Sequence, residues 1–131
     1  MVIGSKAQRS AAEWLEDFAR AVRARDYAAA RSYFDEDVLG FGTVVPRAEG
    51  LDRLEADQWR AVWDVTTAFA FHAPRVVELD AVAFVAAEWS STYVVDGSRR
   101  RGRATIILRH AEGGWRAVHS HFSLEPSGQL R

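Results

Sequence analysis

Two histidines separated by one residue, His119 and His121, are the side chains of this sequence best suited to acid–base chemistry. Imidazole exchanges a proton near neutral pH, and its neutral form both donates and accepts hydrogen bonds. Because side chains alternate along a strand, both rings share one face if residues 115–124 form a strand. General acid–base catalysis, ligand binding and a structural or interface role all remain open. A metal site needs a third ligand, and Glu88 has the wrong parity, so we predict no metal site.

Composition excludes several classes of protein. Seventeen basic residues meet eighteen acidic ones in 131 residues, and this balance argues against nucleic acid as a partner. Cysteine is absent, which excludes disulfides and thiolate chemistry. No apolar run approaches the length of a membrane span, and the first ten residues lack a signal peptide. We therefore expect a cytoplasmic protein with no cofactor and no membrane partner.

The first half of the chain has helical spacing after a polar segment, 1–9, that we expect to be a loose arm. Ser10 and Glu13 form a capping box, and the apolar residues that follow recur every three or four positions. Asp26 can cap a second, short helix, and residues 51–63 return to helical spacing. Between these helices we expect a turn at 35–37, a β-like segment at 38–45 and a loop at 46–50. Gly40 and Gly42 indicate a bend or a close backbone approach in that segment.

The second half is rich in β-forming residues and has no helical period. Four segments are separated by short turns, at 66–79, 82–95, 101–110 and 115–124. Neighbouring strands joined by short turns must be antiparallel. We therefore predict a single α+β domain in which three N-terminal helices cover one face of the sheet.

The end of the chain carries a family resemblance. The run Gly113-Gly114-Trp115-Arg116-Ala117-Val118-His119-Ser120-His121-Phe122-Ser123 resembles the end of SnoaL-like domains, in the nuclear transport factor 2-like superfamily. It is also similar to the association domain of calcium/calmodulin-dependent kinase II. The resemblance covers residues 10–125 and leaves 126–131 as a tail. It implies a cone-shaped fold of three helices on a curved, mostly antiparallel sheet around one apolar pocket. Homodimers through the outer sheet face are also implied, but no single function is.

Ketosteroid isomerase is the best-known enzyme of this fold. It needs a carboxylate base, a tyrosine and a protonated carboxylic acid. Aligning the chain with that enzyme places Phe18 at the tyrosine, Gly42 at the base and Ile106 at the acid. None of these side chains transfers a proton, so the sequence argues against ketosteroid isomerase activity.

The resemblance also decides which strand faces should point into the pocket. It places His119, His121 and Ser123 inward, whereas composition alone would place Val118 and Phe122 there. Together with the alternation of side chains along strands, the resemblance predicts that the pocket wall is mostly apolar and that Tyr93 adds a polar group to it. The expected ligand-binding residues of this wall are Phe18, Trp59, Trp63, Ala87, Trp89, Ile106, Leu108 and Ser123.

Three functions remain open at this stage. The leading hypothesis is a protein that binds a small apolar or aromatic ligand bearing one or two oxygens. The second is a cofactor-free isomerase, cyclase or dehydratase-type enzyme, with His119 or His121 as base and Tyr93 as hydrogen-bond donor. The third is an oligomeric assembly domain.

Two surface features bear on partners. The outer sheet face should expose apolar residues, which predicts a sheet-to-sheet homodimer; they are Ala86, Val94, Ile107 and Val118. Arginines 99, 100, 101 and 103 lie at an expected hairpin tip. We interpret them as a solvated turn, with contact to an anion or an acidic partner as the alternative.

Overall fold

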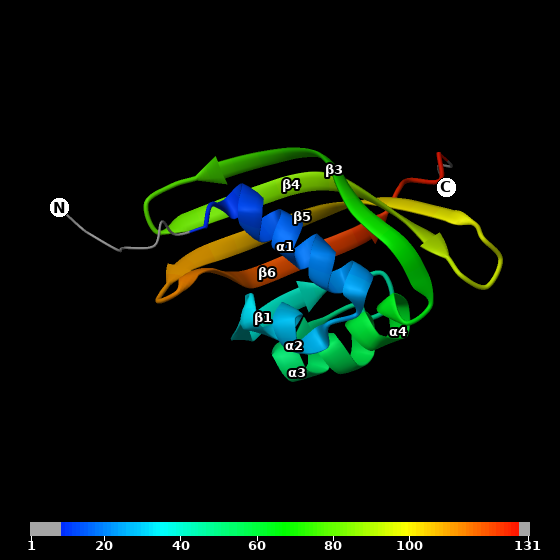
Figure 1. The fold of residues 1–131 in the computed structure, drawn as a ribbon, viewed down its shortest axis with the longest axis horizontal. Helices are drawn as coiled ribbons and strands as arrows, with labels where there is room; N and C mark the ends of the chain where they lie inside the picture. The colour runs from blue at the N-terminus through cyan, green and yellow to red at the C-terminus, as the bar shows by residue number, and fades with distance from the viewer. Residues whose placement is uncertain (1–8, 129–131) are drawn as a thin grey trace.

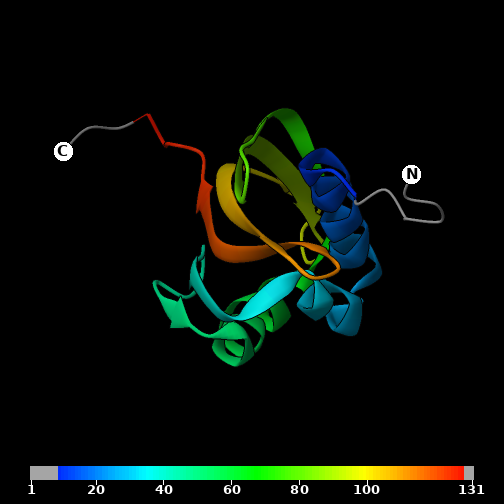
Figure 2. The same cartoon turned by 90° about the vertical axis from the view of Figure 1, so that its left-hand side faces the viewer.

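The computed structural model describes residues 9–128 of the chain. The expected arm at 1–9 lies outside the described residues except for Arg9, and the expected tail at 126–131 lies partly outside them. Six strands form one sheet, and the helices pack against its concave side (Figures 1 and 2).

The helices begin where the sequence predicts. Helix α1 (Ala11–Ala24) is preceded by the expected capping box: Ser10 Oγ accepts from Glu13 N at 3.1 Å, and Ser10 N donates to Glu13 Oε1 at 2.7 Å. Helix α2 (Tyr27–Ser32) is capped by Asp26. The third helical region consists of α3 (Leu51–Leu54), a π-helical turn (Glu55–Trp59) and α4 (Arg60–Trp63).

The sheet combines four long antiparallel strands with a short strand pair. The strand order is β2-β1-β6-β5-β4-β3, and β1 runs parallel to β6 while every other pair is antiparallel. The fold is therefore α+β, as the sequence predicts. The strand bounds are β1 Phe34–Phe41, β2 Ala48–Glu49, β3 Thr66–Glu78, β4 Val82–Tyr93, β5 Arg99–Ala111 and β6 Gly114–Leu124.

Three local predictions are wrong. Residues 35–37 belong to β1 rather than to a turn, and residues 48–49 form β2 rather than loop. The segment predicted as β-like at 38–45 ends as a strand at Phe41, and residues 42–45 form a loop. The residues Asp35-Glu36-Asp37 are typical of a turn. The segment is a strand instead, because Phe34 pairs with Ala117 of β6. Arg109 of β5 also holds Asp35 in a salt bridge of 2.8 Å. Pairing across the sheet thus overrides the local preference of these residues.

The core lies between α1 and the concave face of the sheet. Trp14 of α1 is fully buried, and its ring centroid lies 5.4 Å from that of Phe18 and 5.7 Å from that of Phe34. Its indole Nε1 donates to the Tyr33 carbonyl oxygen at 3.1 Å. From the sheet, Val85, Ile106 and Leu108 are fully buried opposite the helices. This part of the interior is filled, and the cavity described next lies beyond it.

Candidate functional site

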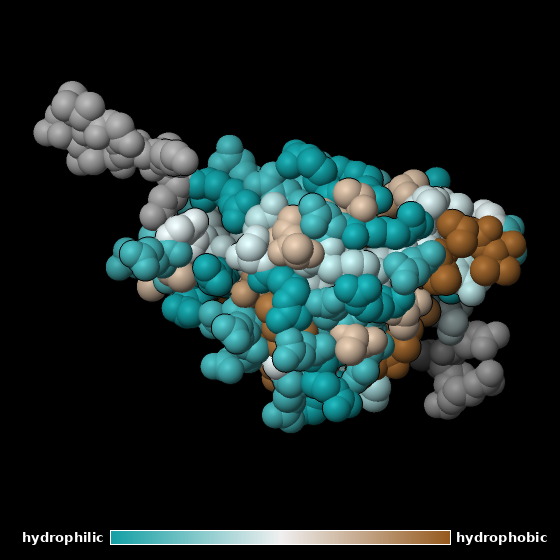
Figure 3. Space-filling view, turned by 60° about the horizontal axis from the view of Figure 1, so that its bottom comes forward, coloured by the Kyte–Doolittle hydropathy of each residue, from teal (hydrophilic) through white to brown (hydrophobic). Residues whose placement is uncertain are grey.

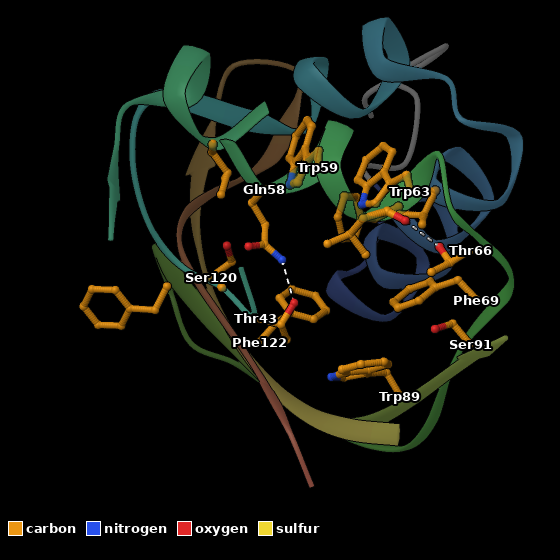
Figure 4. Close-up of a pocket in the computed structure, with 16 residues that line it drawn as sticks. Thr43, Gln58, Trp59, Trp63, Thr66, Phe69, Trp89, Ser91, Ser120 and Phe122 are labelled. Atoms are coloured by element: carbon orange, nitrogen blue, oxygen red, sulfur yellow. Dashed lines mark hydrogen bonds between the residues drawn. The ribbon is translucent and has the colours of Figure 1, made fainter. Parts of the chain in front are cut away.

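A pocket opens between the third helical region and the concave side of the sheet (Figure 4). Its volume is about 50 Å³, several times the roughly 10–15 Å³ that one water molecule requires. Most lining side chains are apolar or aromatic, and a few carry hydroxyl or amide groups. The lining residues are Phe18, Val22, Phe41, Gly42, Thr43, Leu54, Gln58, Trp59, Val62, Trp63, Thr66, Phe69, Trp89, Ser91, Ser120 and Phe122.

Tryptophans stand on opposite walls of the pocket (Figure 4). Trp59 and Trp63 come from the third helical region and stack on each other, with ring centroids 4.7 Å apart and an interplanar angle of 17°. Trp89 of β4 faces them from the sheet and lies 6.4 Å from Phe122 of β6. Flat aromatic walls of this kind suit a flat apolar ligand.

Gln58 fixes the loop that closes one side of the pocket. Its Oε1 accepts hydrogen bonds from the backbone N–H groups of Val44 and Val45 at 2.8 and 2.9 Å. Its Nε2 donates to Thr43 Oγ1 at 2.9 Å, the bond drawn in Figure 4. The Gln58 amide is therefore engaged in holding the loop rather than free for a ligand.

Gly40 of β1 and Gly42, which directly follows β1, permit this arrangement. A Cβ atom at Gly42 would overlap the Gln58 side chain, and one at Gly40 would come within 2.6 Å of Leu54. The third helical region thus lies directly against the β1 backbone, which confirms the predicted close approach.

Two serine hydroxyls line the pocket without an internal partner. Ser91 of β4 and Ser120 of β6 are 5% and 3% exposed. Within residues 9–128, neither side chain has a hydrogen-bond partner, and no fully enclosed polar side-chain atom lacks one. These hydroxyls must therefore reach the open space of the pocket, where a ligand or water can bond to them. The alternation of side chains along β4 correctly predicts that Ser91 faces inward. The sequence did not predict an inward position for Ser120.

Four predicted ligand-binding residues line the pocket: Phe18, Trp59, Trp63 and Trp89. Three others do not, because they are buried in the filled core: Ala87, Ile106 and Leu108. Tyr93 lies at the mouth of the pocket, in an adjoining groove. Sequence reasoning missed Gln58, Phe69, Ser120 and Phe122, although composition had favoured an inward Phe122.

The expectation that His119 and His121 face the pocket is wrong. Strand β6 pairs with β5 through Ile107–His119 and Leu108–Ala117, so Val118 is an extra residue that forms a β-bulge. Before the bulge, Trp115 and Ala117 face the core; after it, Ser120 and Phe122 do. One inserted residue thus reverses the alternation of side chains. Odd-numbered residues of β6 face inward before the bulge and even-numbered residues face inward after it, so neither predicted face holds for the whole strand.

The two histidines lie on the outer face instead. His119 Nδ1 is 2.7 Å from the Leu39 carbonyl oxygen, which satisfies that ring nitrogen. Both rings pack edge-on against Phe41, at centroid distances of 5.2 and 5.4 Å. His121 is exposed, and Ser123 is on the same side, opposite Arg103 of β5. The pair is therefore not positioned to act on a molecule in the pocket.

The pocket itself has no group that titrates near neutral pH. None of its lining residues is acidic, basic, tyrosine or histidine, and Phe18 and Gly42 stand at two positions aligned with isomerase residues. In residues 9–128 no group of three or more His, Cys, Asp or Glu side chains could hold a metal ion. No helix in the described part of the chain is long and apolar enough to span a membrane.

Tyr27 supports the helical wall of the pocket from behind. Its ring stacks on Trp63 at 5.1 Å and 8°, and its hydroxyl donates to Asp64 Oδ1 at 2.6 Å. Burial and the hydrogen bond to this carboxylate raise the pKa of Tyr27 to about 12.

We expect this shift to appear in the alkaline unfolding of the protein. Between pH 10 and about 12 the unfolded chain loses the Tyr27 proton while the folded chain keeps it, so stability falls as pH rises. Urea unfolding at several pH values should show this fall in the wild type and a flatter profile in Tyr27→Phe. Identical pH profiles for the two proteins would contradict the assignment.

Solved structures share this fold. One from Xanthomonas campestris, assigned as a calcium/calmodulin dependent protein kinase II association domain, has a TM-score of 0.80 at 16% identity, covering 97% of this chain and 94% of that one. An NTF2-like protein of unknown function from Pseudomonas putida has a TM-score of 0.78 at 19% identity, with coverages of 94% and 93%. A ketosteroid isomerase-like protein from Erwinia carotovora has a TM-score of 0.73 at 21% identity, with coverages of 86% and 92%.

These likenesses establish the nuclear transport factor 2-like fold and do not carry a function to this chain. Comparison with curated proteins finds no match. The model of the SnoaL-like domain matches residues 12–126, which is most of the chain and includes every described helix and strand except the first residue of α1. The chain therefore belongs to the SnoaL-like domain family.

Proposed function

We propose that this protein binds a small, flat, largely apolar molecule bearing one or two oxygen atoms, in the pocket between the third helical region and the sheet. The observation that carries the proposal is the pair of buried serine hydroxyls, Ser91 and Ser120, that lack internal partners among aromatic walls. Polar groups this deeply buried are ordinarily hydrogen-bonded, and here a ligand oxygen can supply the partner. The aromatic walls supply apolar contact.

Binding without chemistry fits this lining better than catalysis does. A general acid or base must reach the reacting atoms, and the pocket lining offers hydroxyl and amide groups but no carboxylate or imidazole. The catalytic alternative relied on His119 and His121, which lie on the other side of the sheet. In that alternative Tyr93 is the hydrogen-bond donor, and without the histidines no general base accompanies it in the pocket.

Titration calorimetry with 2-naphthol tests the proposal; this molecule is larger than the pocket volume of about 50 Å³ and must extend through the open mouth. Ser91 pairs with Arg100 and Ser120 with Ile106, so the two hydroxyls are well separated along the sheet and the single oxygen of 2-naphthol can bond only one of them. The Ser→Ala variant that removes this hydroxyl should weaken binding about fivefold, because a net hydrogen bond contributes about 1 kcal/mol. Neither hydroxyl has a partner within the described chain, so urea unfolding should show stabilities close to that of the wild type. His121→Ala is the matched control and should leave affinity unchanged, because its ring is on the outer face.

Two outcomes would overturn the pocket as the binding site. One is serine variants that bind 2-naphthol as the wild type does. The other is an affinity that falls in His121→Ala and not in the serine variants. Absence of measurable binding by the wild type would refute the proposed ligand class.

We further propose that the outer sheet face pairs with the same face of a second copy. Glu88 and Arg103 are cross-strand neighbours on this face, both are exposed, and neither forms a salt bridge within residues 9–128. Phe84 and Ile107, also cross-strand neighbours, add apolar surface. A two-fold axis through this face can pair Arg103 of each copy with Glu88 of the other, which makes the surface self-complementary.

Light scattering should then report twice the chain mass of 14.6 kDa at tens of micromolar. Arg103→Glu and Glu88→Arg should each shift the protein toward monomer, because each places like charges opposite one another. The double variant, Arg103→Glu with Glu88→Arg, should restore the dimer. A 14.6 kDa wild type at this concentration would refute the interface.

A further inference from the structure

The pocket continues into a groove at its mouth. The groove has a volume of about 260 Å³ and shares five residues with the pocket: Thr43, Val62, Thr66, Trp89 and Ser91. Val44 and Leu124 on its rim are 58% and 49% exposed. Figure 3 shows apolar side chains gathered at the end of the molecule that carries the β4–β5 hairpin. A ligand larger than the pocket can therefore extend outward over apolar surface.

Arg100 is the only charged residue among those that line the pocket and this groove, within the described chain. It pairs with Ser91 across the β4–β5 ladder. Side chains on this part of β5 alternate, and buried Gly102 and Ala104 mark the inward face, so Arg100 points to the concave side. Arg100 therefore lies at the mouth, on the strand position opposite Ser91.

The Arg100 guanidinium is held in place, and the nearby Asp96 carboxylate, whose pKa is lowered by its hydrogen bonds from Ser98 and by the charge of Arg100, forms no salt bridge with it. It lies 4.5 Å from the centroid of the Tyr93 ring, a cation–π contact that restricts its motion. Its Nε is 3.5 Å from Ser98 Oγ. No carboxylate in residues 9–128 forms a salt bridge with it, and Asp96 of the same hairpin accepts its hydrogen bond from Ser98 N. Most of the Arg100 donors remain available to an anion.

We infer that the ligand is a monocarboxylate, with its flat apolar body in the pocket and its carboxylate at the mouth, against Arg100 and the Ser91 hydroxyl. This inference rests on the proposed function and specifies its ligand class. Guanidinium presents a planar pair of N–H donors that matches a carboxylate, and the apolar rim strengthens the pairing by limiting water. The pocket lining contains no negative charge that would repel such an anion.

The test compares two probes of nearly the same size and shape, the anionic 2-naphthoate and the neutral 2-naphthamide, by titration calorimetry. The wild type should bind the naphthoate more tightly, and added NaCl should weaken the naphthoate alone. Arg100→Gln should weaken the naphthoate about tenfold and leave the naphthamide within about twofold, since only the charged probe uses the guanidinium. Arg100→Lys should retain part of the affinity because it keeps the charge and loses the planar fork.

Arg99→Gln is the matched control. Arg99 is adjacent in sequence but pairs with Thr92 and points to the opposite face, so this variant should bind both probes as the wild type does. Equal wild-type affinity for the two probes, or an equal loss of both in Arg100→Gln, would overturn the carboxylate assignment while leaving the pocket intact. Binding of neither probe would refute the proposed function together with this inference.

Discussion

Replacing Gly102 with alanine should destabilise the protein by about 3 kcal/mol, because the new methyl group has no space to occupy. Gly102 is buried on β5 and is paired with Trp89 of β4. A Cβ atom there would overlap the Ser123 carbonyl oxygen of β6 and lie 2.5 Å from the Trp89 ring. The first contact is with backbone, which cannot rotate away, so β5 and β6 must separate.

The effect should extend to the pocket, since Trp89 forms its sheet-side wall. Urea unfolding followed by circular dichroism measures the loss of stability, and calorimetry with 2-naphthol measures the accompanying loss of binding. Gly97→Ala is the control, because Gly97 has a φ of +72° but open space around its Cβ position. It should cost about 1 kcal/mol for the strained backbone alone. Equal stability losses in the two variants would contradict the steric argument.

Replacing Trp14 with alanine should cost about 4 kcal/mol, the cost typical of removing a large buried aromatic side chain. Trp14 is fully buried and touches the rings of Phe18, Tyr33 and Phe34, so its removal leaves a cavity at the junction of α1 and β1. The Tyr33 carbonyl oxygen loses one donor but keeps the Ala117 N–H at 2.9 Å. Lost packing, rather than an unsatisfied carbonyl, therefore accounts for most of the cost.

Trp14→Phe separates these two contributions. It keeps one aromatic ring and removes the indole N–H together with the rest of the bicycle, so the hydrogen bond is lost with only a small part of the packing, and the cost should be about 1–2 kcal/mol. The free energies of unfolding of the two variants and the wild type come from urea titrations. A loss in Trp14→Phe as large as that in Trp14→Ala would show that the hydrogen bond, and not the packing, dominates.

Local signals in the sequence were sufficient for the helices and for the class of fold. The Ser10–Glu13 capping box fixes the start of α1, and turn chemistry separates the long strands. Gly40 and Gly42 indicated that another element approaches the backbone there, and Leu54 and Gln58 are the residues that do. Each of these signals depends on residues that are close in the sequence.

The candidate site was harder to predict because it depends on pairing between distant segments. The bulge at Val118 lies where β6 pairs with both β5 and β1, and it turns Ser120 and Phe122 inward and the histidines outward. No local pattern distinguishes Val118 from an ordinary strand residue. The helical spacing places Gln58 beside Trp59 on the apolar side of its helix, but the partners of its amide, the N–H groups of Val44 and Val45 and the Thr43 hydroxyl, come from a loop that the helix pattern does not reveal.

The location of the ligand can be tested most directly with the five tryptophan indole N–H signals, followed by NMR during titration with 2-naphthol. Three of these residues line the pocket, Trp59, Trp63 and Trp89, while Trp14 and Trp115 are buried away from it. We predict that the three pocket signals shift in a saturable manner and that the other two stay in place. Saturable shifts confined to the ring signals of His119 and His121, with Trp59, Trp63 and Trp89 unmoved, would contradict the account.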